Sequence, residues 1–141
     1  MAIRRANARW EGGLKGGKGT FSAGPGIEGA YSFSSRFEEG TGSNPESLLG
    51  AAHAACFSMA LSAALERGGT PATSVSTEAA VTLEKLDAGF TVTRVKLTVR
   101  GAVAGVSQDD FAKAAEGAKA GCPISRALAP SVVVELDARL T

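Results

Sequence analysis

The sequence predicts an α+β protein with a single domain over residues 1–141. Three observations support this class: short apolar runs between glycines near the N-terminus, an alanine-rich stretch of helical periodicity, and segments in which apolar and polar residues alternate. The resulting order is strands, helix, hairpin, helices, strand, which is typical of proteins whose strands pair antiparallel. A chain of 141 residues buries enough surface to form a core without cross-links.

Composition narrows the class of partner. The 15 lysines and arginines nearly balance the 14 aspartates and glutamates, so the net charge of +1 argues against nucleic acid or an anionic membrane as partner. No apolar run follows Arg4, Arg5 and Arg9, and no apolar stretch of about 20 residues stands out. We therefore expect a cytoplasmic protein without a signal peptide or membrane span. That reducing compartment disfavours a structural disulfide.

The first third of the chain is rich in glycine. Residues 8–31 hold short runs between glycines, which predicts two or three short strands joined by turns. A phosphate-binding loop is rejected because no GxGxxG or GK(S/T) motif follows a strand and opens a helix. Residues 34–43 are polar, include Arg36, and are expected to be irregular.

A long helix is expected in the middle of the chain. Asn44-Pro45-Glu46 supplies a cap, a proline at the first helical position and an acidic first turn, and Gly68-Gly69 ends the helix after Arg67. The segment is nearly uncharged, so we expect it to be buried on most sides. The expected core stripe comprises Leu48, Ala52, Ala55, Met59 and Ala63, widened by Leu49, Cys56 and Ala60.

A hairpin, two helices and a final strand complete the prediction. Residues 75–86 alternate as a strand and turn at 87–89, and the second strand changes parity, which requires a bulge near Thr93-Arg94. Ser107 opens a helix that Gly121 ends, with Phe111, Ala114, Ala115 and Ala118 on its apolar side. A short helix then runs from Cys122-Pro123 to about Leu128, and the last strand alternates over residues 132–140.

The two cysteines and the single histidine carry the distinctive chemistry. Three such ligands exclude a closed four-ligand zinc site built only from Cys and His. Cys56 lies mid-helix and Cys122 opens the short helix, and the two can meet if their helices pack side by side on one sheet. Inert buried thiols and a redox-active pair both remain open at this point.

The positions of the two cysteines in their helices predict which thiol is the more reactive. A helix N-terminus lowers the pKa of a thiol, which favours Cys122 as the more reactive, whereas burial would raise that of Cys56. Cys56 would then need a nearby cation. His53, three residues earlier, and Arg36, in the preceding loop, are the candidates, although a lone helical histidine is more often a packing residue and a loop arginine is more often solvated.

Several segments resemble the OsmC/Ohr family of thiol-dependent hydroperoxide reductases. Residues 44–61 (NPESLLGAAHAACFSMAL) are similar to the central helix of the OsmC branch, residues 119–125 (KAGCPIS) to its second-cysteine motif, and residues 86–90 (LDAGF) to its hairpin turn. The likeness extends from residues 8–12 to the last strand. The Ohr branch places its arginine in an N-terminal glycine-rich motif, and Gly12-Gly13-Leu14-Lys15 lacks it, which favours the OsmC branch.

The resemblance implies a fold and a set of roles. The fold would have antiparallel sheets wrapped around long central helices in an intertwined homodimer, with active sites at the subunit interface. Cys56 would be the peroxidatic thiol and Cys122 the resolving thiol that forms the disulfide. Arg36 would support the Cys56 thiolate, and Glu46 would orient that arginine.

The implied activity is the reduction of organic hydroperoxides, and more weakly of hydrogen peroxide, in oxidative or osmotic stress defence. No cofactor or metal is expected, only a thiol reductant, for which the family suggests lipoyl dithiols. Phe37, Phe57, Met59 and Ile124 are candidates for an apolar rim, or simply for core packing. A non-enzymatic redox sensor and a small-ligand binding module are the alternatives, and the role of His53 stays open.

Overall fold

The computed structural model describes residues 1–141, which divide into two compact units, Met1–Leu48 and Leu49–Thr141. Each unit has its own three-stranded sheet. The first contains β1 (Asn7–Glu11), β2 (Lys18–Ser22), β3 (Glu28–Tyr31), α1 (Phe33–Phe37) and the first residues of α2 (Pro45–Arg67). The second contains the rest of α2, then β4 (Ala72–Leu86), β5 (Gly89–Val103), α3 (Gln108–Gly121), α4 (Pro123–Leu128) and β6 (Val133–Leu140).

The sheet of the first unit has the order β1-β2-β3, with both pairs antiparallel, as the glycine-rich segment predicts. Gly19 in β2 is buried beneath the rings of Trp10 and Tyr31, whose centroids lie 5.4 Å apart. A Cβ atom at Gly19 would approach the Tyr31 ring to 2.5 Å and the Trp10 ring to 2.8 Å. Glycine is required here because two aromatic rings cover the strand.

A short helix, α1, occupies the start of the segment that was expected to be irregular. Ser32 and Ser35 form a capping box: the Ser35 N–H donates to Ser32 Oγ (3.0 Å) and the Ser32 N–H to Ser35 Oγ (2.8 Å). Those two bonds satisfy backbone donors that a helix start leaves unpaired. The expectation was wrong because the box is completed by a serine at a position where glutamate or glutamine is the usual signal.

Both ends of α2 lie where the sequence predicts. Asn44 Oδ1 accepts the Ser47 N–H at 2.7 Å and caps the first turn. At the other end Gly69 has φ +83°, and the N–H groups of Gly69 and Thr70 return to the carbonyls of Glu66 and Leu65, both at 3.0 Å. This pair of bonds is a Schellman motif, which needs a residue in the left-handed region and so favours glycine.

The buried face of α2 is not the predicted one. Ala52, Ala55 and Met59 of the expected core stripe are exposed, Met59 to 75%. Spacing alone could not choose between faces, because alanine contributes little burial energy on any side; the largest side chains decide instead. The buried row consists of Gly50, His53, Phe57, Leu61 and Leu65.

By length and composition alone, α2 could cross a membrane, so the expectation that no such apolar stretch exists was too strong. The same test is passed by the central helix of a packed core. The fully buried Phe57 and Leu61 belong to such a core, together with residues of β5 and α3.

The second sheet has the order β4-β5-β6, and the predicted hairpin of β4 and β5 is antiparallel. Thr82 pairs with Arg94, and the next residue, Leu83, pairs with Val92. Thr93 is therefore the extra residue of a bulge, at the position that the change of parity predicts.

The pairing of β6 with β5 is parallel, which contradicts the antiparallel prediction. In register, Val95 faces Val134 and Leu97 faces Leu136. The connection from β5 to β6 runs through α3 and α4, and a helical crossover returns the chain to the end of the sheet from which it started. The apolar alternation of the last strand was read correctly, but alternation does not report strand direction.

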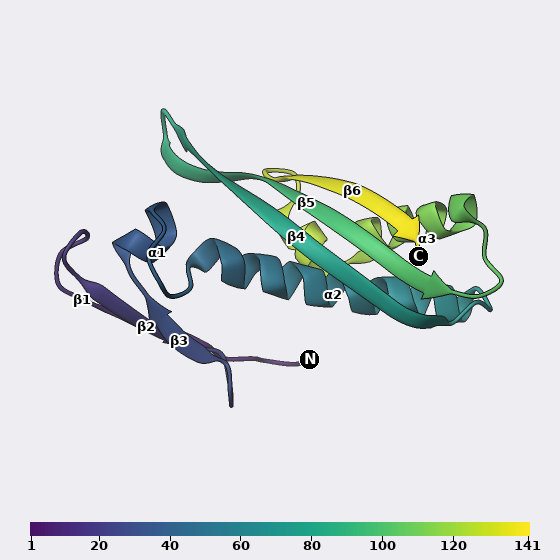
Figure 1. The fold of residues 1–141 in the computed structure, drawn as a ribbon, viewed down its shortest axis with the longest axis horizontal. Coiled ribbons are helices and arrows are strands. Elements are labelled where there is room, and N and C mark those ends of the chain that lie inside the picture. Colours follow the sequence, from purple (N-terminus) through teal and green to yellow (C-terminus); the bar gives the residue numbers. More distant parts are fainter. The chain divides into compact units, whose positions relative to one another are not determined.

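The core of the second unit lies on one face of its sheet. Val95, Leu97 and Val99 alternate along β5 and are fully buried. They pack with the buried residues of α2 and with Phe111 and Ala115 of α3, so both helices cover the same face. Figure 1 shows β6 alongside β5, with α3 beside them.

Two glycines provide a matched test of this packing. A Cβ atom at Gly101 of β5 would lie 2.5 Å from Phe111 Cζ, whereas one at Gly117 of α3 would meet nothing within 4 Å. We expect Gly101→Ala to lower the free energy of unfolding by about 1–3 kcal/mol through overpacking. We expect Gly117→Ala to raise it by about 0.5–1 kcal/mol because alanine is the better helix former. Urea denaturation measures both; equal effects would contradict this packing.

Candidate active site

The two cysteines meet in the second unit. Cys56 lies on α2, Cys122 lies between α3 and α4, and their sulfur atoms are 3.3 Å apart. Both are free thiols; Cys122 is fully buried and Cys56 is half-buried. The expectation that packing of two helices on one sheet brings the cysteines together is therefore confirmed.

Local structure places Cys122 at a junction. It ends α3, where its N–H donates to the Ala118 carbonyl at 2.8 Å, and it caps α4, where its carbonyl accepts the Arg126 N–H at 3.0 Å. Pro123 follows at the first position of α4, which needs no N–H donor there. The side chain of Cys122 is thereby turned into the core beside α2.

The pKa values of the two thiols move in opposite directions. Burial alone would raise the pKa of Cys122, but hydrogen bonds from the Ser125 N–H, the Cys56 thiol, the Ser125 hydroxyl and the Ile124 N–H together lower it. Burial raises the pKa of Cys56, and the neighbouring Cys122 raises it further, against one hydrogen bond from the Ile124 N–H. The pKa of Cys122 is thus shifted below that of Cys56, which agrees with the order of reactivity expected from sequence position.

His53 takes no part as a cation. Its side chain is fully buried, Nε2 lies 2.7 Å from Ser125 Oγ, and burial lowers the pKa of the imidazole. It is therefore neutral at pH 7 and cannot supply the charge considered for Cys56. The contact with Ser125 spans 72 residues and left no signal in the sequence.

Arg36 and Glu46 form an ion pair in the first unit. Arg36 Nε lies 3.2 Å from both carboxylate oxygens, and Nη2 lies 2.7 Å from Oε1. The pair is held because α1 is tied to the start of α2: Ser35 Oγ donates to the Ser43 carbonyl at 2.6 Å, and Asn44 Nδ2 donates to the Ser35 carbonyl at 3.4 Å. A two-point contact of this kind fixes the plane of the guanidinium.

Arg36 also borders an apolar recess of about 220 Å³. Its guanidinium carbon lies 5.1 Å from the centre of the Phe37 ring, and that ring lies 5.0 Å from Phe33. The recess thus combines aromatic walls with one cation. Its other lining residues are Trp10, Leu14, Tyr31 and Ser32.

The four candidates for an apolar rim separate in the structure. Phe37 lines the recess beside Arg36, and Met59 is exposed on α2. Phe57 is fully buried in the core, so its proposed place on a rim was wrong. Ile124 is half-buried, and its backbone N–H lowers the pKa of both cysteine thiols.

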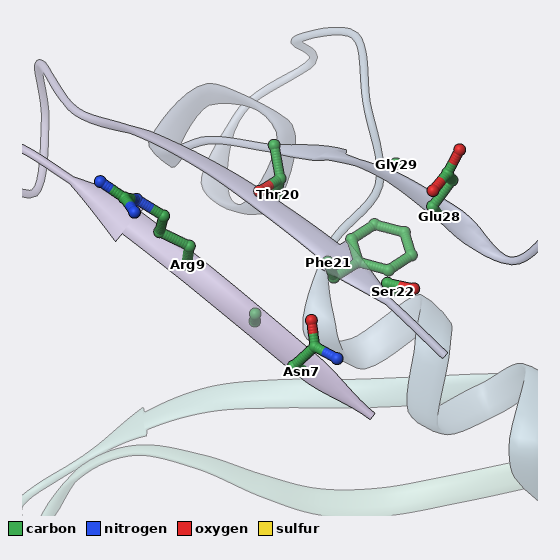
Figure 2. Close-up of a pocket in the computed structure, with 8 residues that line it drawn as sticks. Asn7, Arg9, Thr20, Phe21, Ser22, Glu28 and Gly29 are labelled. Atoms are coloured by element: carbon green, nitrogen blue, oxygen red, sulfur yellow. The ribbon is translucent and has the colours of Figure 1, made fainter. Parts of the chain in front are cut away.

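A second groove, of about 400 Å³, crosses the sheet of the first unit. Figure 2 shows Asn7 and Arg9 from β1, Phe21 from β2 and Glu28 from β3 along it. None of the four predicted site residues lines it. No group of three or more His, Cys, Asp or Glu side chains comes together in the chain.

The chain is similar in sequence to proteins of one known family. The sequence model of the OsmC-like protein family matches residues 38–137. The chain belongs to this family. Peroxiredoxin OsmC of Escherichia coli (strain K12) is 46% identical over 134 residues, which are 94% of this chain and 94% of that protein. Peroxiredoxin OsmC of Shigella flexneri matches to the same extent.

Solved structures support the same assignment to OsmC and Ohr proteins. The organic hydroperoxide resistance protein OsmC of Legionella pneumophila superposes with a TM-score of 0.77 at 25% identity, covering 99% of both chains. The organic hydroperoxide resistance protein OhrB of Bacillus subtilis gives 0.76 at 26% identity, covering 98% of this chain and 100% of that one. The α+β fold with helices against antiparallel hairpins is thus that of the OsmC family.

Burial of the single histidine predicts a pH-dependent stability. The pKa of His53 is lowered in the folded chain, and on unfolding it returns toward its ordinary value of 6.5. The unfolded chain then binds a proton that the folded chain does not, so stability falls as the pH drops below about 6.5, by at most about 1.4 kcal/mol per pH unit. Urea denaturation from pH 7.5 to 5 measures the loss. His53→Gln should show a flatter profile; an identical slope in both proteins would contradict the assignment.

Proposed function

We propose that this chain reduces organic hydroperoxides to alcohols, with Cys56 as the peroxidatic thiol and Cys122 as the resolving thiol. Thiol-dependent peroxidase activity is the function that membership of the OsmC family and the relatives named peroxiredoxin support. The observation that carries the residue assignment is the 3.3 Å separation of the two sulfurs. Only a short movement separates these thiols from a disulfide.

The reaction balances with these two thiols and one reductant. The Cys56 thiolate attacks the peroxide oxygen, the O–O bond breaks, and the products are Cys56 sulfenic acid and an alkoxide that takes a proton to become the alcohol. The Cys122 sulfur then attacks the Cys56 sulfur, the S–O bond breaks, and water leaves as the disulfide forms. A dithiol returns both cysteines to thiols and becomes a disulfide itself.

Activation of Cys56 requires a cation, since burial and its neighbour raise its pKa. We assign this role to Arg36, oriented by Glu46 through the two-point ion pair. Along α2, ten residues at 1.5 Å per residue separate Glu46 from Cys56 by about 15 Å. We therefore assign Arg36 and Glu46 of one chain to Cys56 of a second copy, in a homodimer with its active sites at the interface.

The exposed side of α2 supports a second copy as the partner. Ala51, Ala55 and Met59 follow one another at intervals of four residues and form an exposed apolar row. A helix with small residues on such a face allows close approach of another helix. In the proposed dimer the two units of each chain act as one domain.

The recess beside Arg36 supports an organic substrate. Its walls include Trp10, Phe33 and Phe37, which offer apolar contact to an alkyl or aryl group near the cation. Hydrogen peroxide lacks such a group and would gain nothing from these walls. We propose that electrons come from a dithiol of the lipoyl type, that no cofactor takes part, and that the protein works in the reducing cytoplasm.

Turnover tests the roles of the two thiols. The wild-type protein should consume many equivalents of cumene hydroperoxide in the presence of a dithiol, whereas a sensor would be oxidised once. We expect Cys56→Ser to lose activity by at least about a hundredfold, because the remaining thiol, Cys122, is fully buried and out of reach of the peroxide. Cys122→Ser should still react once and accumulate a sulfenic acid, visible by intact mass. Full activity in Cys56→Ser would refute the assignment.

Subunit mixing tests the shared site. Arg36→Met and Cys56→Ser chains should each be inactive, but a refolded equal mixture should recover about a quarter of wild-type activity: half of the dimers are mixed, and one of their two sites is intact. Initial rates with cumene hydroperoxide measure this. No recovery, with mixed dimers shown by native mass spectrometry, would place Arg36 and Cys56 of the same chain in one site.

A further inference from the structure

A row of hydrogen-bonding side chains leads from the cysteine pair into the core. Cys56 Sγ lies 3.3 Å from Cys122 Sγ, and His53 Nε2 lies 2.7 Å from Ser125 Oγ. Two residues three positions apart on α2 thus face two residues three positions apart at the start of α4. His53 is fully buried and Ser125 is 6% exposed. The peroxidase reaction described above uses neither residue.

The direction of the hydrogen bonds follows from what His53 lacks. Its Nδ1 is buried and has no hydrogen-bond partner. A proton on Nδ1 would be a buried, unsatisfied donor, so the proton belongs on Nε2, where it is donated to Ser125 Oγ. The single hydroxyl proton of Ser125 is then free to point toward another acceptor. The Cys122 sulfur, three residues earlier in the chain, is an available acceptor, and the Ser125 side chain lowers the pKa of that thiol.

We propose that His53 and Ser125 are positioning residues that aim the Ser125 hydroxyl proton at the Cys122 sulfur. We call the row His53, Ser125 and Cys122 the relay. The proposal rests on the proposed function, because it assigns the relay to the resolving thiol of that reaction. No proton is transferred along the relay. His53 donates a hydrogen bond from Nε2, and Ser125 donates one with its own hydroxyl proton.

The relay acts most directly in the reductive half of the cycle. Cys122 is fully buried in the core, whereas Cys56 is half-buried, so an incoming dithiol reaches the Cys56 sulfur of the disulfide. The S–S bond then breaks with its electron pair going to Cys122, and the reductant sulfur forms a mixed disulfide with Cys56. A leaving thiol with a lower pKa leaves faster, and the Ser125 hydroxyl stabilises that leaving sulfur.

The charged surroundings do not replace the relay. Lys119 and Arg126 line a groove of about 220 Å³ that Ser125 also borders, and Lys119 is paired with Glu116 at 3.0 Å. From α2 the titratable groups facing Cys122 are Cys56 and His53. The groups that lower the pKa of Cys122 are instead the backbone of α4, the Cys56 thiol and the Ser125 hydroxyl.

The test measures how fast the Cys56–Cys122 disulfide is reduced, with Cys122 as the leaving thiol and no peroxide present. The disulfide is formed with diamide, which oxidises two thiols and is itself reduced to the hydrazine. Its reduction by dithiothreitol is followed at pH 7 by alkylation and intact mass. We expect Ser125→Ala to slow this reduction by roughly tenfold, the size of one hydrogen bond to a charged sulfur, and Ser125→Thr to restore it.

His53 is tested by a matched pair. His53→Gln keeps an N–H donor at about the reach of Nε2, whereas His53→Met has similar bulk and no donor. We expect the glutamine variant to behave like the wild type and the methionine variant to resemble Ser125→Ala. Ser58→Ala is the control, because it removes another hydroxyl bond of α2, the 2.8 Å contact with Thr77, without touching Cys122.

A second readout separates a positioning role from a structural one. In a Cys56→Ser background, thiolate absorbance near 240 nm titrates Cys122 alone, and Ser125→Ala should move its midpoint to higher pH. An unchanged midpoint and an unchanged reduction rate in Ser125→Ala would overturn the proposal, as would equal rates for His53→Gln and His53→Met. Neither result bears on peroxide turnover, so the proposed function would stand. If the methionine variant does not fold, Ser125→Ala carries the test.

Discussion

The site depends on the packing of α2 and α3 against the same face of β5. Phe57 from α2, Phe111 from α3 and Leu97 from β5 are fully buried in one cluster. Side chains of that size bring about 1.5–3 kcal/mol each on burial, far more than either cysteine contributes. The contact between the two sulfurs is therefore a consequence of core packing, and a change that loosens this cluster moves the thiols apart even if both cysteines remain.

That packing gives the two thiols different environments. Cys122 lies where α3 ends and α4 begins, next to backbone N–H groups that lack helical partners, and the backbone of Ser125 and Ile124 lowers the pKa of its thiol. Cys56 lies mid-helix, where its own helix offers no free donor. Burial raises the pKa of both thiols, but the groups around Cys122 outweigh it, so the pKa of Cys122 is lowered whereas that of Cys56 is raised. In the proposed reaction Cys56 therefore needs a cation, and the Arg36 assigned to that role is oriented by its ion pair with Glu46.

The sequence predicted the features that local chemistry determines. Asn44 as a cap, Gly69 as a helix stop and Thr93 in a bulge each follow from short-range rules, and all three were confirmed. The parallel direction of β6 could not be predicted, because alternation is the same in either direction. The buried face of α2 was missed because alanine at nearly every turn makes several stripes look alike.

The candidate site likewise combines residues that the sequence could nominate with a contact that it could not. Motifs nominated four candidate site residues: Cys56, Cys122, Arg36 and Glu46. The contact between His53 and Ser125, in contrast, joins residues 72 positions apart that no local pattern links. A buried imidazole with one empty nitrogen costs stability, which a hydrophobic side chain of the same bulk would avoid. The proposed relay would account for this cost, because the imidazole N–H orients the Ser125 hydroxyl toward the Cys122 sulfur. In the proposed reaction the lowered pKa of Cys122 suits a leaving group, and Cys56, whose pKa is raised, is the nucleophile that the substrate and the arginine together would activate. The difference between the two environments thus matches the different steps proposed for the two thiols.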